Sequence, residues 1–405
     1  MSSPNSPFKA IIVGGGPIGL AAAHALHLAD IDFVVLERRP AIFEDRGASL
    51  IVHPHTLRVL HQFGILDELL PRGDIYSRWS RLQRGESAAA DISTSSASHG
   101  HGPVAFHRAE LIEIMYNGLP KPAKDKILTD KKLTSITTTQ DGVTATCADS
   151  SVFHGSIVIG ADGVYSRTRQ VMRNLALKRE LDSTVGPPTP IHGDIPASLP
   201  VIPFTFAGWP GTLSRRSFAE FPLTKTVKVK DVWPRMLGAG LTNLDEGIAK
   251  HWSFGRIVLV VDACHKMTTH LGLGFNHGIQ DVMVLCNGLR KALLAAPGRM
   301  GPDTEALTGL FEKYQAVRMS SVCSLEGDVL KSGLETRVHA WHNVWYYLLS
   351  WYLLALNVVE NLFMKFVMAP EFRKGQVLDY VTRDERIKGK ISWLYPMSSQ
   401  AKKED

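Results

Sequence analysis

The chain is poor in cysteine: it has four among 405 residues, and none forms a C-x-x-C pair. Such sparse, widely spaced cysteines exclude a small disulfide-rich scaffold and indicate free thiols in a reducing compartment. The N-terminus also lacks the apolar core of a secretory signal peptide. We therefore expect an intracellular protein.

Other functional signatures are missing as well. There is no run of five or more Lys or Arg residues and no zinc-finger or RNP pattern. The net charge of +6 therefore favours an anionic cofactor or membrane over nucleic acid. The absence of a G-x-S-x-G motif argues against a serine hydrolase. His265, His270 and His277 have no supporting Cys or carboxylate spacing, so no metal site is expected.

What the chain does have is enough apolar sequence, 44%, for a large core. Its length suggests two or three domains. Residues 180–222 hold eight of the 22 prolines and are poor candidates for regular structure, because proline fixes φ and lacks an N–H donor. We predict four segments: 1–172, a shortened substrate-domain segment 173–230, a second part of the first domain at 231–300, and a C-terminal helical region 301–405.

The first informative motif is a glycine-rich loop near the N-terminus. Residues 9–13 are apolar and predict a buried strand, residues 20–29 predict a helix, and residues 33–36 predict a second strand that ends at Glu37. Between the first strand and the helix lies the G-x-G-x-x-G pattern of residues 14–19. This arrangement is typical of dinucleotide binding.

Each glycine has a physical role in that prediction. Gly14 permits the tight turn, Gly16 lets a pyrophosphate approach the backbone, and Gly19 lets the helix pack on the strand. The helix N-terminus offers N–H donors to phosphates. Glu37 can accept hydrogen bonds from ribose hydroxyls, which favours FAD or NAD over NADP at this site.

Two later segments narrow the choice of dinucleotide. Residues 157–169 contain an apolar strand followed by G-A-D-G-x-x-S-x-x-R, and residues 256–265 read R-x-x-L-x-x-D-A-x-H. A glycine-rich loop and a helix start follow at residues 271–281. The three motifs in this order resemble the FAD-dependent monooxygenases of the p-hydroxybenzoate hydroxylase group.

Within that group, residues 47–55, 106–111 and 271–281 resemble fungal enzymes that oxidise prenylated meroterpenoids and indole diterpenes. The resemblance implies an α/β fold, with a Rossmann-like FAD-binding domain, a reduced β-sheet substrate domain and a C-terminal hydrophobic helical segment. It implies an FAD-dependent monooxygenase that uses NAD(P)H and O₂ to epoxidise or hydroxylate a lipophilic prenylated secondary metabolite.

The resemblance also implies roles for individual residues. Glu37 would bind the adenosine ribose, Arg108 the phosphates and ribityl chain, and Asp262 a ribityl hydroxyl. From the residues alone, Arg108 could equally be a surface helix residue, Asp162 a turn residue and Asp262 a cap. The cofactor-binding residues that it implies are Gly14, Gly16, Gly19, Glu37, Gly47, Ala48, Arg108, Asp162, Asp262, Gly272, Gly274 and Phe275. No catalytic side chain is assigned.

Three features depart from the family pattern. Val261 stands where the family has glycine, and its Cβ is expected to crowd the cofactor. Thr269 replaces a proline, and the middle region is short and proline-rich. These departures keep two alternatives open: a degenerate, membrane-associated flavoprotein fold, and an FAD-dependent dehydrogenase or oxidase that transfers no oxygen to its product.

The C-terminal region contains an apolar stretch. Residues 342–359 contain no Asp, Glu, Lys or Arg, and aromatic residues crowd one end. A spanning helix needs about 20 apolar residues, so segment 341–369 predicts either membrane association or a buried helix. We expect membrane association, at a membrane of the endoplasmic-reticulum type.

Overall fold

The structure is a computed structural model. It describes residues 7–43, 49–75, 78–83, 86–91, 98–182, 219–220, 226–232, 234, 247–266, 272–296, 301–322, 344–345, 362 and 364–398. Of the predicted features, Gly47, Ala48 and Thr269 lie outside these residues. So do most of segment 173–230 and most of segment 341–369.

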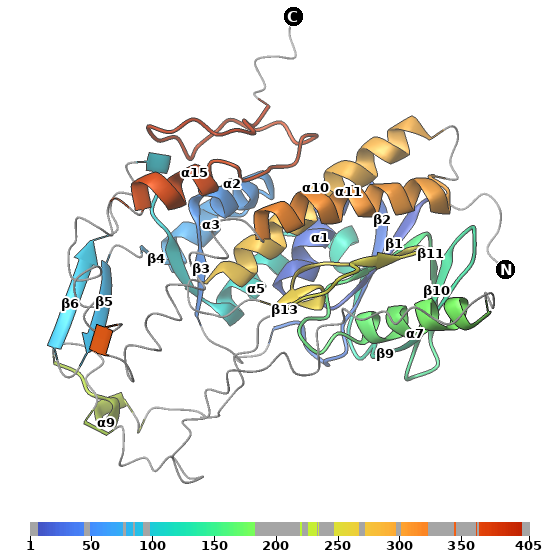
Figure 1. Cartoon of the computed structure of the whole chain (residues 1–405), viewed down its shortest axis with the longest axis horizontal. Coiled ribbons are helices and arrows are strands. Elements are labelled where there is room, and N and C mark those ends of the chain that lie inside the picture. Colours follow the sequence, from blue (N-terminus) through green and yellow to red (C-terminus); the bar gives the residue numbers. More distant parts are fainter. Residues whose placement is uncertain are drawn as a thin grey trace, which may run out of the picture.

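A six-stranded sheet forms the centre of the molecule (Figure 1). Its strand order is β14-β15-β12-β1-β2-β8, and all neighbours are parallel except β14 and β15. The strands are β1 (Lys9–Val13), β2 (Asp32–Leu36), β8 (Ile127–Leu128), β12 (Ile157–Gly160), β14 (Ser253–Phe254) and β15 (Ile257–Leu259). The strands predicted on either side of the glycine loop are confirmed as β1 and β2, both almost wholly buried.

The sheet joins segments that are far apart in the sequence. Strand β12 lies between β1 and β15, and Val158 is in register with Ile257. The chain therefore leaves this sheet after β12, at residue 160, and returns to it at β14, at residue 253. Because parallel strands end at the same edge, the loops after β1, β12 and β15 meet there.

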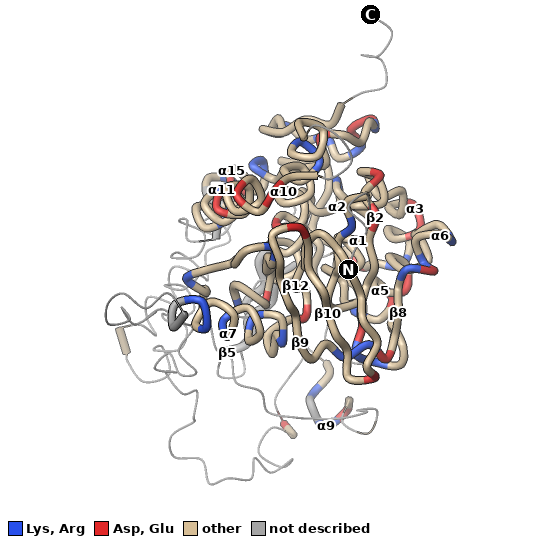
Figure 2. The backbone as a smooth tube through the Cα atoms, turned by 90° about the vertical axis from the view of Figure 1, so that its right-hand side faces the viewer, with Lys and Arg blue, Asp and Glu red and all other residues tan. Residues whose placement is uncertain are grey.

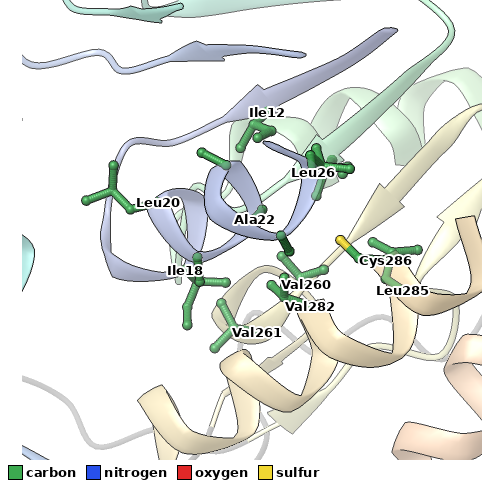
Figure 3. Packing of buried hydrophobic residues seen from close by; sticks show 14 of the residues in the cluster. Ile12, Ile18, Leu20, Ala22, Leu26, Val260, Val261, Val282, Leu285 and Cys286 are labelled. Atoms are coloured by element: carbon green, nitrogen blue, oxygen red, sulfur yellow. The ribbon is translucent and has the colours of Figure 1, made fainter. Parts of the chain in front are cut away.

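Helices bury one side of this sheet. Helix α1 (Pro17–Leu28) follows the glycine loop and packs against α5 (Arg108–Asn117) and α10 (Leu273–Ala295). Helix α11 (Thr304–Val322) packs in turn on α10. Figure 3 shows Ile18 and Leu26 of α1 close to Val282 and Cys286 of α10. These side chains belong to one continuous hydrophobic core.

A three-stranded antiparallel meander precedes β12 in the chain. It consists of β9 (Leu133–Thr138), β10 (Val143–Cys147) and β11 (Val152–Gly155). Strand β10 shows the strict alternation of buried and half-buried residues that is typical of a strand with one face on the core. Helix α7 (Arg167–Asp182) contacts β9 as well as β14 and β15.

A second region lies outside the six-stranded sheet and has strands of its own. Its three-stranded sheet has the order β3 (Ser49–Val52), β7 (Val104–His107) and β4 (Asp74–Ile75), and a hairpin joins β5 (Arg78–Gln83) to β6 (Glu86–Asp91). Helix α2 (Pro54–Gln62) is almost fully buried. The remaining short elements are α3 (Leu66–Leu69), η1 (Leu70–Arg72), α6 (Lys121–Lys124), α9 (Val229–Val232), β13 (Gly247–Ile248), η3 (Val261–Ala263) and β16 (His265–Lys266).

The C-terminal segment returns to the core. After η5 (Met364–Met368) and α15 (Ala369–Phe372), residues 373–398 pass over α2 (Figure 1). The Gln62 side chain donates to the Leu378 carbonyl and accepts from the Leu378 amide, both at 2.8 Å. Asn287 of α10 makes equivalent bonds to Val377 and Asp379. Among the helices that the structure describes, none is both long and apolar enough to cross a bilayer.

Candidate cofactor site

The glycine loop after β1 is shaped by two close backbone contacts. Gly14 has φ of 108°, and a Cβ there would lie 2.5 Å from the Ala161 carbonyl oxygen. A Cβ at Gly19 would lie 1.8 Å from the Gly14 carbonyl oxygen. Both glycines are therefore required by packing: one brings the loop against the end of β12, and the other brings α1 against the loop.

Gly16 differs from its neighbours, because a Cβ built on it would meet nothing within 4 Å. It is the N-cap of α1, where no side chain forms a cap hydrogen bond and no acidic residue lies in the first turn. Pro17 occupies the first helical position, and the N–H groups of the first turn have no partner within the helix. This cradle fits the pyrophosphate of a dinucleotide.

Glu37 directly follows β2 and is 4% exposed. Its Oε2 accepts from the Gly15 amide at 2.7 Å, and its Oε1 accepts from the backbone and side chain of Arg39 at 2.9 Å. Burial alone would raise the pKa of Glu37, but these donors outweigh it and lower the pKa. The ionised carboxylate holds the loop and retains acceptor capacity for ribose hydroxyls.

Arg108 and Asp262 are 154 positions apart in the sequence, yet each affects the pKa of the other. Burial and the nearby Arg39 lower the pKa of Arg108, while Asp262 opposes the shift. Burial raises the pKa of Asp262, and His265 and Arg108 act against it. The N-terminus of α5 and the loop after β15 therefore carry charged groups that act on each other.

Asp162 forms bonds inside its own turn. Its Oδ1 accepts from the Ser166 hydroxyl at 2.5 Å, and its Oδ2 accepts from the amide and hydroxyl of Thr168 at 2.9 and 3.0 Å. These bonds fix the turn from which α7 begins. Gly163, with φ of 78°, has no atom within 4 Å of a built Cβ, so its backbone lies open to a ligand.

Arg169 is a residue whose role sequence reasoning missed. Its guanidinium donates to the Ala263 carbonyl at 2.9 Å, the Asp262 carbonyl at 3.4 Å and the Val164 carbonyl at 2.8 Å. It thereby ties the second motif to the third. Figure 2 shows further Lys and Arg positions along α7.

Val261, the departure from the family glycine, has φ of 51°. This left-handed conformation suits glycine and strains a β-branched residue. The side chain is 6% exposed and lies in the core beside Ile18 (Figure 3). A Cβ at Gly278 would lie 2.7 Å from Val261 Cγ2, so valine fits because position 278 is glycine. The cost of the departure thus lies in backbone strain within the core.

The start of α10 supplies one glycine in close contact with β3, one open glycine position and a buried aromatic ring. Gly272, with φ of 64°, is the N-cap and approaches Ile51 of β3; a Cβ at Gly274 would meet nothing within 4 Å. Phe275 is 5% exposed and packs in the core. Asn276, which sequence reasoning missed, donates to the Ile51 and Gly272 carbonyls at 2.8 Å and joins β3 to α10.

Cys264, His265 and Asp281 have potential ligand atoms within 4.8 Å of one another. Asp281 is already bonded to His265 and to Arg318 at 2.7 and 2.6 Å. Burial raises the pKa of the Cys264 thiol, which keeps it protonated. Both carboxylate oxygens of Asp281 accept hydrogen bonds, so the group forms a buried ion-pair cluster.

Comparison with known proteins agrees with this site. The family described as FAD binding domain matches residues 8–186 and 209–300. The FAD-dependent monooxygenase srdH of Neurospora crassa is 31% identical over 376 residues, covering 78% of this chain and 83% of the relative. The FAD-dependent monooxygenase dpchE of Colletotrichum higginsianum is 30% identical over 397 residues, covering 84% and 82%.

Solved structures share the fold. HpxO of Klebsiella pneumoniae, complexed with FAD and uric acid, superposes with a TM-score of 0.54 at 20% identity, covering 78% of this chain and 85% of that one. The glycine cradle, the Glu37 carboxylate and the Arg108–Asp262 pair fit FAD. The chain belongs to the FAD-dependent monooxygenases of the FAD binding domain family, oxidoreductases that use FAD and typically NAD(P)H.

Proposed function

We propose that this monooxygenase transfers one oxygen atom from O₂ to a lipophilic, prenylated secondary metabolite of the meroterpenoid type, by epoxidation or hydroxylation. The observation that supports this substrate class is the resemblance of residues 47–55, 106–111 and 271–281 to fungal enzymes of that chemistry. The relatives at 30 and 31% identity are fungal FAD-dependent monooxygenases, in keeping with the proposed type of reaction.

FAD, when bound, supplies the chemistry that takes hydride from NAD(P)H and activates O₂. The residues of this chain bind and orient it. The backbone at Gly16 receives the pyrophosphate, Glu37 accepts from the ribose, and the open backbone of Gly274 gives close approach at the start of α10. Arg108 supplies positive charge and Asp262 an acceptor for the chain that links the two halves of the cofactor.

We also propose that the protein associates with a membrane of the endoplasmic-reticulum type. Support comes from the sequence: residues 342–359 contain no charged side chain, and a membrane would concentrate a lipophilic substrate. Fractionation of cells that express the full chain tests this. The full chain should sediment with membranes and resist a high-salt wash; recovery in the supernatant would refute the association.

Incorporation of labelled oxygen tests the reaction. The holoenzyme is incubated with NADPH, ¹⁸O₂ and a panel of farnesylated phenols, with the saturated-side-chain analogues as matched controls. One ¹⁸O atom in an epoxide or alcohol of the farnesylated compounds supports the proposal. Dehydrogenated product without ¹⁸O would favour the dehydrogenase or oxidase alternative. NADPH oxidation unaffected by any prenylated compound would refute the substrate class.

A further inference from the structure

Asp281, on the third turn of α10, lies at the centre of a buried charge cluster. Its side chain is 0% exposed, and its Oδ1 accepts from Arg318 Nε of α11 at 2.6 Å. Burial alone would raise the pKa of Asp281, but His265 and Arg318 outweigh it and hold the pKa well below its ordinary value. The carboxylate is therefore ionised and rigidly placed.

The other oxygen of Asp281 joins the two ends of the loop that presents Asp262. Oδ2 accepts from the Val261 amide at 2.8 Å and from His265 Nε2 at 2.7 Å. Val261 and His265 are the residues just before and three residues after Asp262. One carboxylate oxygen thus fixes both ends of the five-residue turn that contains Asp262.

The middle of the same turn is held from a different element. Arg169 of α7 donates to the carbonyls of Asp262 and Ala263. The left-handed backbone of Val261 is strained, and such strain persists only where the surrounding structure fixes the residue. The bonds from Asp281 and Arg169 provide that fixation.

We propose that Asp281 is a positioning residue for the cofactor: it sets the geometry of the Val261–Asp262 turn against FAD, with Arg169 as the second anchor. The inference concerns cofactor binding and is independent of the proposed substrate. Neither residue needs to touch FAD. Their effect reaches it through the backbone of the turn.

The test compares variants by FAD release and by the visible spectrum of the bound flavin, both measured on diluted holoenzyme. Asp281→Asn keeps the shape but removes the charge. It should weaken FAD binding by about tenfold to a hundredfold, comparable to the loss of metal affinity when a residue that orients a metal ligand is removed, and alter the flavin band shape. The matched control is Glu385→Gln, which breaks the buried Arg58–Glu385 pair away from the turn. It should lower thermal stability and leave FAD affinity and spectrum unchanged.

A second pair of variants, one test and one control, is used if Asp281→Asn does not fold. Arg169 is half-buried, so Arg169→Gln should fold, and it should weaken FAD binding in the same direction. Its control is Arg167→Gln on the same helix, whose guanidinium reaches Thr134 and Gln170 instead of the turn. Wild-type FAD affinity and spectrum in folded Arg169→Gln, or in folded Asp281→Asn, would overturn the proposal. An equal loss in either control would do the same.

Discussion

The carbonyl oxygen of Gly14 lies 1.8 Å from where a Cβ on Gly19 would be. The obstacle is backbone, so it cannot move aside as a flexible side chain could. We expect Gly19→Ala to push α1 away from the loop and to destabilise the fold by about 3 kcal/mol. Urea unfolding monitored by circular dichroism measures this, and wild-type stability would contradict the packing role of Gly19.

Gly16→Ala should leave the stability of the fold unchanged and weaken FAD binding. A Cβ there meets nothing within 4 Å, so the stability of the FAD-free protein should stay within about 0.5 kcal/mol of wild type. The methyl group would instead enter the space that fits the pyrophosphate. FAD affinity, measured by flavin fluorescence, should fall by about tenfold or more. Unchanged affinity would show that the phosphate lies elsewhere.

Glu37 should make stability depend on acidic pH. Its pKa is lowered in the folded protein, so its contribution is present above the ordinary value of 4.5 and is lost as the pH falls through the lower folded value. Glu37→Gln should therefore reduce the free energy of unfolding at pH 6, with the difference from wild type shrinking below pH 4.5. Glu68→Gln, at an exposed position, serves as control. A difference that grows toward acid would refute the assignment.

His24 should make stability depend on pH in a range above that of Glu37. Burial lowers its pKa from 6.5 to about 4, although Nε2 lies 2.7 Å from the Met115 carbonyl oxygen. The unfolded chain therefore takes up a proton that the folded one excludes, and stability falls as the pH drops from 6.5 toward 4. The slope is up to about 1.4 kcal/mol per pH unit. His24→Gln should remove this part of the slope in urea titrations. Exposed His27→Gln should not, and equal slopes in wild type and His24→Gln would contradict the prediction.

Arg58 should anchor the C-terminal segment. Its guanidinium is buried, donates to Glu385 at 2.8 Å and lies 4.2 Å from the centre of the Trp393 ring. Arg58→Met leaves the Glu385 charge without its partner and should cost about 3 kcal/mol. Residues 373–398 should become sensitive to protease. Arg72→Met, which breaks an exposed pair, is the control; comparable protease sensitivity in both would refute the anchoring role.

Local sequence predicted the parts of the fold that local interactions form. The alternation in Val143–Cys147, the apolar run Lys9–Val13 and the glycine loop each carry their own signal within a few residues. The same holds for Glu37, because an acid at the end of the second strand is a fixed part of the dinucleotide pattern.

The parts that escaped prediction depend on partners far along the chain. Nothing near Asp281 in the sequence indicates that Arg318 and Val261 meet its carboxylate. Likewise, the bonds from Gln62 to Leu378 span 316 positions and involve backbone groups, which have no sequence signature. Val261 was expected to matter through its side chain, whereas its backbone conformation is the unusual feature.

The pairing of β12 with β15 has a consequence for synthesis on the ribosome. Val158 cannot meet Ile257 until about a hundred further residues have emerged, so the central sheet stays open along one edge during that interval. An unpaired, apolar strand edge attracts other chains. Newly made molecules are thus most exposed to aggregation while the middle of the chain is being translated, and the surfaces that receive FAD come together only after residue 262 has left the exit tunnel.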